Sequence, residues 1–328
     1  MKRSGKLILV LLVVMLSSSC AGLKSVEETP PELTHIRLPM GYIPNVQYAP
    51  FYAGVEEGFF AEEGLEIEFD YSYETDGVAL VGANELQFSL VSGEQVPIAR
   101  AEGVPIVYVL AWYGQYPIAV IAKSEQNLKV PQDMAGKRIG LPGLFGANYV
   151  GLRALMGYAG LEEKDLILES VGFNQVEVLA ADTSEVIVGY IANEPVQLAA
   201  QGYDLDVLLV SDYLDLVSNG LITNEITIAE NPDLIRRMVS ATLKSIQFAV
   251  ENPDAAFQHC FKYIEGLEDA DQEVQRQVLE SSLALYQIDP YGYSSPQAWE
   301  NMQKVLLDMG LMKEEINLTE AYTNEFSQ

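Results

Sequence analysis

Short apolar runs typical of strands alternate with runs of helical periodicity from Ile36 onward, and short turns join them. This alternation limits the fold more than any other feature, because it predicts an α/β protein. One face of the best-defined helix repeats at i, i+3, i+4 and i+7 and carries Tyr48, Phe51, Tyr52 and Val55. With 49% hydrophobic residues among 328, the chain can bury one large core or two modest ones.

The predicted elements form two α/β sets followed by a helical tail. Strands are predicted over residues 36–40, 65–70, 87–91, 105–112, 117–122, 137–141, 166–171, 186–190 and 205–210. Helices are predicted over residues 48–57, 76–83, 93–102 and 146–159, and in the tail over 232–250, from 253, over 271–285 and over 296–309. The pattern is helical after about residue 220.

The tail holds too few strands for a third α/β domain. We therefore expect it to pack on the first lobe, so that the chain crosses between two lobes twice. We predict the first part of lobe 1 over 35–122, lobe 2 over 123–215, and the return to lobe 1 with the helical tail over 216–328. Because α/β folds bind ligands outside the carboxyl ends of their strands, the expected site is a cleft between the lobes.

The N-terminus has the form of a bacterial export signal. Basic residues among the first six precede an unbroken apolar run from Leu7 to Leu16, which is too short to span a bilayer. Three serines then lead to Cys20 in a pattern that resembles a lipobox, although Ser17 stands where a large aliphatic residue is usual. We predict a signal peptide over 1–19, lipidation at Cys20 and a tether over 20–34. The protein is then expected in the cell envelope, outside the cytoplasm and anchored to the membrane.

Charge and reactive side chains exclude several functions. A net charge of −28, with the acids spread along the chain, produces a surface that repels nucleic acid. His35 and His259 show no metal-ligand spacing and lie near no serine-bearing turn. Cys260 is expected as a small buried hydrophobe on a helix. We expect no metal, no cofactor, no nucleic-acid partner and no catalysis.

The segment from Gly41 to Phe60 is the richest in candidate binding residues. It joins a strand to a helix through a Pro-Asn turn, and Tyr42, Asn45 and Tyr48 lie at that turn. Asparagine offers donors and acceptors, and tyrosine offers a ring face and a hydroxyl, so we expect these side chains in the cleft. For Tyr48, packing in the core remains an alternative, and for Phe51 the core is the expected place.

Three further turns are expected at the same cleft, over residues 92–95, 112–116 and 140–148. The last is rich in glycine, which lets backbone amides approach a ligand at a helix N-terminus, but it lacks the ending of a phosphate loop. Ser92 is also placed to cap a helix with Gln95 three residues later, and Glu94 fits solvent equally well. The candidate ligand-binding residues in these turns are Ser92, Glu94, Trp112, Tyr113, Tyr116, Gly143 and Phe145.

From about Ile36 to Leu267 the chain resembles the type II periplasmic binding proteins. The resemblance is to the branch that includes binders of thiamine pyrimidine precursors, riboflavin and alkanesulfonates. It rests on the segments GYIPNVQYAPFYAGVEEGFFAEEGLEIEF, SGEQVPIARAEGVPIVYV, DMAGKRIGLPG and VGYIANEP. It implies a two-lobed fold with the ligand between the lobes, and an ABC permease with its ATPase as partners. We also expect a monomer.

The resemblance carries over to single positions. Tyr42 stands where binders of pyrimidine precursors often have tryptophan, and Asn45 matches their asparagine. Tyr48 stands where many have histidine, which weakens the case for a pyrimidine precursor. A strand end that contacts ligand in relatives matches Tyr190, Asn193 and Glu194.

Four functions follow from the resemblance, in descending order. The chain looks most similar to riboflavin-binding lipoproteins, so riboflavin is the expected ligand. A thiamine pyrimidine precursor, of the hydroxymethylpyrimidine or formylaminopyrimidine type, is the alternative. An alkanesulfonate would require cationic residues in the cleft. A related enzyme branch makes the thiamine pyrimidine with its own histidine and pyridoxal phosphate, and this chain has no histidine near the cleft turns.

Overall fold

The computed structural model describes residues 33–287 and 289–327. The predicted signal peptide and Cys20 lie outside these residues. Among the described residues, no helix combines the length and the apolar character that a membrane span requires.

Two small sheets organise the first lobe. β1 pairs with β2 in parallel, and β10 lies between β3 and β4, antiparallel to both. The strands of this lobe are β1 (Thr34–Gly41), β2 (Leu65–Tyr73), β3 (Ser89–Val91), β4 (Ile106–Ala111) and β10 (Gly220–Asn224). The helices between them are η1 (Val46–Tyr48), α1 (Ala49–Glu56), α2 (Phe59–Glu62), α3 (Glu74–Gly82) and α4 (Gln95–Ala101).

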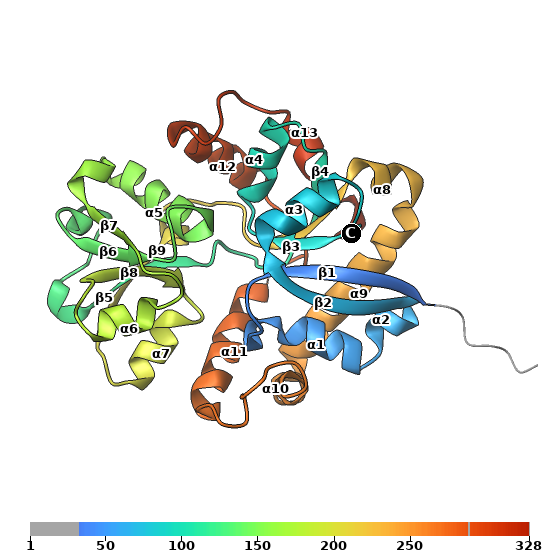
Figure 1. Ribbon diagram of the computed structural model, residues 1–328, viewed down its shortest axis with the longest axis horizontal. Helices are drawn as coiled ribbons and strands as arrows, with labels where there is room; N and C mark the ends of the chain where they lie inside the picture. The colour runs from blue at the N-terminus through green and yellow to red at the C-terminus, as the bar shows by residue number, and fades with distance from the viewer. Residues whose placement is uncertain (1–32, 288, 328) are drawn as a thin grey trace, which may run out of the picture. The chain divides into compact units, whose positions relative to one another are not determined.

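A five-stranded sheet of order β7-β6-β8-β5-β9 forms the second lobe (Figure 1). β6 is parallel to β7 and β8, whereas β5 is antiparallel to β8 and β9. Its strands are β5 (Ile118–Lys123), β6 (Arg138–Leu141), β7 (Ile167–Ser170), β8 (Val186–Tyr190) and β9 (Leu205–Leu209). Its helices are α5 (Gly146–Ala159), α6 (Gln175–Ala180) and α7 (Glu194–Ala200), with short helices η2 (Ser124–Gln126), η3 (Pro131–Met134), η4 (Glu163–Asp165) and η5 (Val210–Asp212).

The sequence of β5 is an unbroken apolar run because both faces of this strand are buried. Ile118 and Val120 belong to the core that includes α5, whereas Ala119 and Ile121 pack with residues of α6 and α7. The sequence predicts this strand at the end of lobe 1, before residue 123. Its pairing with β8 and β9 puts it in the second-lobe sheet, so we propose a lobe boundary before Ile118.

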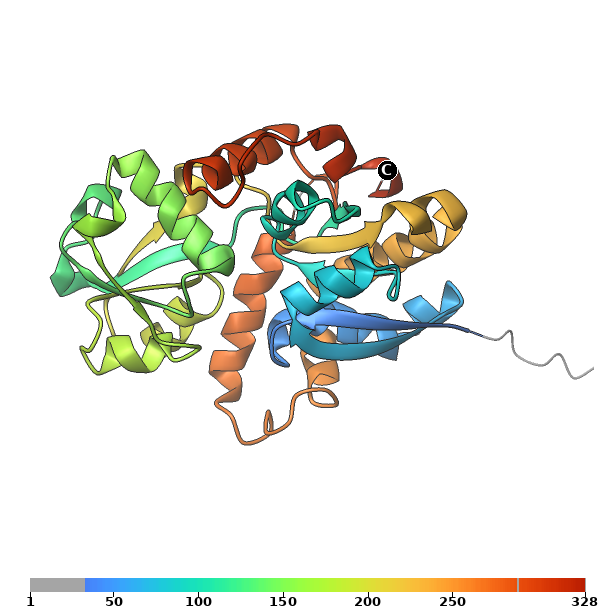
Figure 2. The same ribbon diagram turned by 45° about the horizontal axis from the view of Figure 1, so that its top comes forward.

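The helical tail packs on the first lobe, as predicted. α9 and α10 contact α1, and α11 contacts η1, while α12 also reaches α5 (Figure 2). The tail contains α8 (Glu225–Glu230), α9 (Pro232–Glu251), α10 (Pro253–Cys260), α11 (Gln272–Tyr286), α12 (Pro296–Asp308), α13 (Leu318–Ala321) and η6 (Glu325–Ser327). Asn231 caps α9 by accepting from the Leu234 N–H, and Pro232 opens the helix.

Two predictions about the tail meet different outcomes. Cys260 is fully buried on α10 and its thiol pKa is raised to about 12 by burial, which confirms a packing role. The helical pattern expected after residue 220 is wrong at its start, because residues 220–224 form β10 between two strands from far back in the chain.

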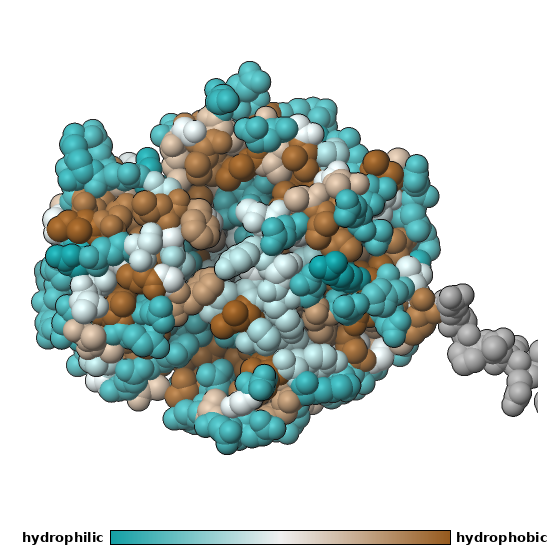
Figure 3. Space-filling view, viewed as in Figure 1, coloured by the Kyte–Doolittle hydropathy of each residue, from teal (hydrophilic) through white to brown (hydrophobic). Residues whose placement is uncertain are grey.

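Hydrophilic residues cover much of the visible surface, with apolar patches between them (Figure 3).

Candidate ligand-binding site

A cavity lies where strand ends and helix starts of the two lobes meet. Tight turns place its side chains, because β1, β4, β6 and β8 each end at its wall and α3, α5 and α7 begin there. The predicted site residues that line it are Tyr42, Tyr48, Ser92, Trp112, Tyr113, Phe145, Tyr190, Asn193 and Glu194.

Stacked aromatic rings make the first-lobe wall of the cavity. The Tyr48 ring stacks on Trp112, with centroids 5.2 Å apart and planes 18° apart. Trp112 stacks in turn on Tyr113 at 4.5 Å, and Tyr113 stacks on Tyr286 at 5.3 Å. Tyr48 is 4% exposed, so it both packs in the core and lines the cavity. The two interpretations of Tyr48 are therefore compatible.

Hydrogen bonds fix this wall in place. The Tyr48 hydroxyl donates to the Met40 carbonyl at 2.7 Å, and the Tyr113 hydroxyl donates to Gln47 Oε1 at 3.0 Å. The Trp112 backbone N–H donates to the Asn219 carbonyl at 2.9 Å. Rings held this way lose little freedom when a ligand stacks on them.

Aromatic side chains from the second lobe form the rim. Phe145 is 70% exposed and Phe173 is 54% exposed, and both line the cavity. The Phe173 ring meets Tyr42 edge to face, with centroids 5.0 Å apart and planes at 79°. Aromatic side chains therefore line the cavity from both lobes.

Two carboxyl groups line the cavity, one from each lobe. Ser92 donates to Glu74 Oε1 twice, and the Tyr190 N–H donates to Glu194 Oε2 at 2.8 Å. Burial raises the pKa of both glutamates to about 7, against these hydrogen bonds, which lower it. Burial and the nearby Glu194 also raise the pKa of Tyr42 to about 12.

Polar groups complete the second-lobe wall. The first turn of α5 contributes Ala147 and Asn148, and Asn148 Oδ1 is buried without a hydrogen-bond partner among the described residues. The Asn219 amide donates to the Tyr190 hydroxyl at 3.2 Å, which joins the residue before β10 to the end of β8. Among the described residues that line the cavity, none is lysine, arginine or histidine.

Two predicted site residues serve the backbone instead of the cavity. Asn45 Oδ1 accepts from the Gln47 N–H at 3.0 Å and so caps η1. Tyr116 is buried, and its hydroxyl donates to the Ala147 carbonyl at 2.8 Å, at the start of α5. Both residue types bind backbone groups as readily as they bind a ligand.

Two other predicted residues lie behind the wall. Gly143 lacks a side chain because the Phe145 ring occupies that space, only 2.3 Å from where a Cβ would lie. Glu94 is 1% exposed, and its Oε2 has no partner among the described residues. Burial and the neighbouring Glu74 raise the pKa of Glu94 to about 8. Glu94 therefore does not occupy the solvent position considered for it, and it is not among the residues that line the cavity.

The prediction from sequence missed several residues of the wall, chiefly Glu74, Asn148, Phe173, Gln175 and Asn219. Glu74 and Gln175 open helices just after strands, so the rule that selected the other turns would have found them. Asn219 precedes β10, the strand that the prediction also missed.

The chain matches known proteins over most of its length. Residues 45–256 match the family described as NMT1/THI5 like. Riboflavin-binding protein RibY of Chloroflexus aurantiacus is 36% identical over 304 residues, which cover 90% of this chain and 87% of the relative. A formylaminopyrimidine-binding protein of Halalkalibacterium halodurans is 26% identical and covers 92% of each chain.

The structure also matches solved proteins. The periplasmic aliphatic sulphonate binding protein SsuA of Escherichia coli aligns with a TM-score of 0.70 at 11% identity, over 88% of this chain and 91% of that one. At this identity the likeness concerns the fold alone. The two-lobed periplasmic-binding-protein fold is thereby confirmed.

Proposed function

The chain belongs to the NMT1/THI5-like family, and on that premise we propose that it is the substrate-binding protein of an ABC importer that captures riboflavin or a close flavin. The observation that carries the ligand assignment is that aromatic side chains line the cavity from both lobes, Tyr48 and Trp112 from the first and the exposed Phe145 from the second. A three-ring isoalloxazine has broad faces for such stacking, and each contact contributes about 0.5–1.5 kcal/mol beyond area burial. The relative named for riboflavin binding supports the same ligand.

A thiamine pyrimidine precursor is the second candidate. The relative named for formylaminopyrimidine binding supports it, and so do the two cavity carboxyls of Glu74 and Glu194, which would accept from an exocyclic amine. A smaller single ring would leave part of the aromatic rim unused, which is why we place it second. An alkanesulfonate fits less well, because no cationic residue is found among the described residues of the wall.

An enzyme reaction has little support from the site. The described wall offers neither a histidine for proton transfer nor a lysine for a Schiff base. The carboxyls and hydroxyls present suit hydrogen bonding to a bound ligand.

The absorbance spectrum of the purified protein is the first test, since a retained flavin absorbs visible light. Calorimetry then compares riboflavin, a hydroxymethylpyrimidine and an aliphatic sulfonate. We expect tight binding of riboflavin alone. Heat with the pyrimidine and none with riboflavin would transfer the assignment to the second candidate. Tight binding of the sulfonate would contradict the aromatic site altogether.

Membrane anchoring through Cys20 is the finer part of this proposal. The basic start, the short apolar run and the serines before Cys20 support it. A diacylglycerol with an amide-linked acyl chain gives stable anchoring. We expect Cys20→Ala to release the protein from the membrane or to leave the precursor uncleaved. Recovery of soluble wild-type protein with an unmodified Cys20 would contradict it.

A further inference from the structure

The charged side chains that line the cavity are all acidic. Glu74 from the first lobe and Glu194 from the second line it, and Glu94 is buried next to Glu74. No described residue of the wall carries a positive charge. A ligand that enters therefore meets carboxyl groups from both lobes without a counter-ion.

Both lining carboxyls are fixed in position. Both hydrogen bonds from Ser92 end on Oε1 of Glu74, at 2.7 and 2.9 Å. Glu194 packs against Gly189 so closely that a Cβ there would lie 2.6 Å from the carboxyl carbon, and its Oε2 accepts from the Tyr190 N–H. These hydrogen bonds use one oxygen of each carboxyl. Neither group can swing away from an anion without losing these contacts.

Of the helices that begin at the wall, α5 is the longest, and the attraction of its N-terminus for an anion is weakened by one of its own side chains. The N-terminus of α5 carries roughly half a positive charge and points its first turn at the cavity. Asn148, in that turn, places a buried and unpartnered Oδ1 in the wall. An acceptor at this place attracts an N–H or O–H donor and repels a phosphate oxygen.

We propose that Glu74 and Glu194 make the site specific for an uncharged ring ligand with hydrogen-bond donors on its rim, and that they reject the phosphate ester of the same ligand. The inference rests on the proposed function for the identity of the ring. It assigns Glu74 as a specificity-determining residue. Like charges brought together in a buried site are strongly unfavourable. The phosphate ester should therefore bind about 100-fold more weakly than the uncharged ligand.

The test is a pair of titrations, with riboflavin and with riboflavin 5′-phosphate at pH 8, on the full chain. Wild-type protein should bind riboflavin about 100-fold more tightly than riboflavin 5′-phosphate. Glu74→Gln and Glu194→Gln should each narrow this ratio about 3- to 10-fold, and the double variant further. Glu66→Gln and Glu177→Gln remove one exposed acid from the same two lobes and should leave the ratio unchanged.

Each outcome has one meaning. Wild-type affinities within threefold of each other would overturn the inference while leaving the proposed function intact. Strong rejection that survives in both glutamine variants, with melting temperatures near that of wild type, would overturn the role of these carboxyls. If riboflavin does not bind, hydroxymethylpyrimidine and its phosphate form the second pair, and the same ratio is expected. Binding of neither pair would contradict both proposals.

Discussion

Ser92 donates two hydrogen bonds to a single oxygen of Glu74, from its hydroxyl at 2.7 Å and from its backbone N–H at 2.9 Å. The capping box that the sequence predicts for Ser92 and Gln95 is therefore wrong. α4 starts at Gln95 with Glu94 in the capping position and without a side-chain cap. Ser92 instead holds a cavity carboxyl that begins α3.

Two substitutions at Ser92 distinguish these roles. Ser92→Ala should lower the free energy of unfolding by about 1 kcal/mol, because one hydrogen bond to Glu74 is lost. Ser92→Asp should lower the free energy of unfolding more than Ser92→Ala does at pH 8, because it adds a carboxylate beside Glu74. Aspartate is as good an N-cap as serine, so equal stability of Ser92→Asp and wild type in urea unfolding would restore the capping role.

Glu94 should make the protein less stable as the pH rises. Its folded pKa is raised to about 8 by burial and by Glu74, from an ordinary value of 4.5. Between these values the folded state keeps a proton that the unfolded state has released, so stability falls across that range. Glu74 and Glu194, with pKa values raised to about 7, act in the same direction.

Glu94→Gln should therefore be more stable than wild type at pH 9, by about 1–3 kcal/mol, and similar to it near pH 4. Urea midpoints at several pH values measure the difference. Glu66→Gln, an exposed acid on β2, is the control and should follow wild type. A constant offset between Glu94→Gln and wild type at every pH would show that the carboxyl does not titrate as described.

The elements predicted best are those whose own sequence contains their signals. The ranges of β8 and α5 were predicted to the residue, since β8 is a short apolar run and α5 ends at Gly160 with φ of 71°. β10 was missed because its short sequence has no strand pattern of its own, and the strand is defined by its pairing with β3 and β4. Long-range pairing leaves little trace in a local pattern.

The site shows the same division. The turns after strands that carry Tyr42, Trp112 and Glu194 come together at one cavity, because the topology brings such turns to the same edge. Residue type alone does not separate side chains that line the cavity from those that bind the backbone, and Asn45 and Tyr116 are found in the second group. That separation depends on which partner lies within hydrogen-bond distance, and folding decides it.

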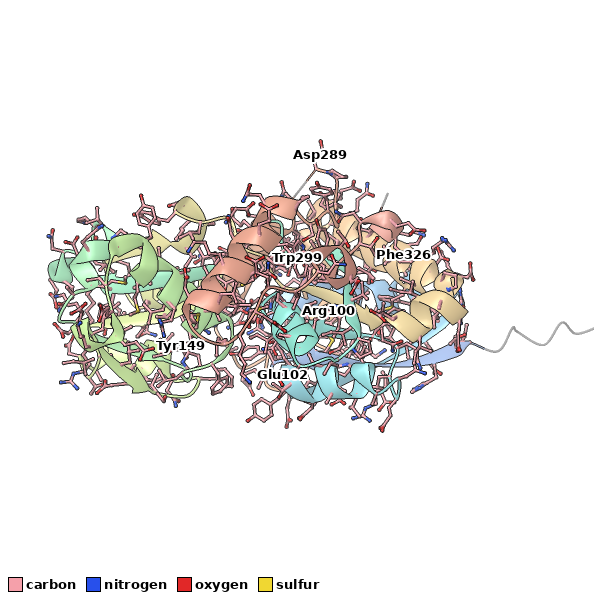
Figure 4. All side chains as sticks on the ribbon, turned by 90° about the horizontal axis from the view of Figure 1, so that it is seen from above. Arg100, Glu102, Tyr149, Asp289, Trp299 and Phe326 are labelled. Atoms are coloured by element: carbon pink, nitrogen blue, oxygen red, sulfur yellow. The ribbon has the colours of Figure 1, made fainter. Side chains whose placement is uncertain are left out.

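The two tryptophans of the chain should have separate roles. Trp112 lines the cavity, whereas Trp299 lies on α12 (Figure 4). Trp299 stacks on Tyr322, and its Nε1 donates to Ser294 at 2.8 Å. Trp112→Phe should weaken riboflavin binding about 2- to 10-fold. Trp299→Phe should lower stability by about 1–3 kcal/mol and leave affinity unchanged. Calorimetry and thermal melts on both variants check this, and an exchange of the two effects would contradict it.

Tyr42 and Phe173 should act together to keep the ligand in place. Tyr42 follows β1 of the first lobe and Phe173 follows β7 of the second, so their edge-to-face contact at 5.0 Å spans the cavity mouth. A contact of this kind contributes about 0.5–1.5 kcal/mol, and it is lost when the lobes separate. Phe173→Ala should therefore raise the rate of ligand dissociation about 2- to 10-fold and change the association rate less.

Tyr42→Ala should weaken riboflavin binding more, by about tenfold or above, because the Tyr42 ring also lines the cavity. The pair Tyr158 and Tyr213 is the matched control, since it is another edge-to-face contact, at 4.9 Å, whose residues do not line this cavity. Stopped-flow measurements should show unchanged dissociation for Tyr158→Ala. If the effects of Tyr42→Ala and Phe173→Ala simply add in the double variant, the two rings act independently, and their contact does not hold the mouth closed.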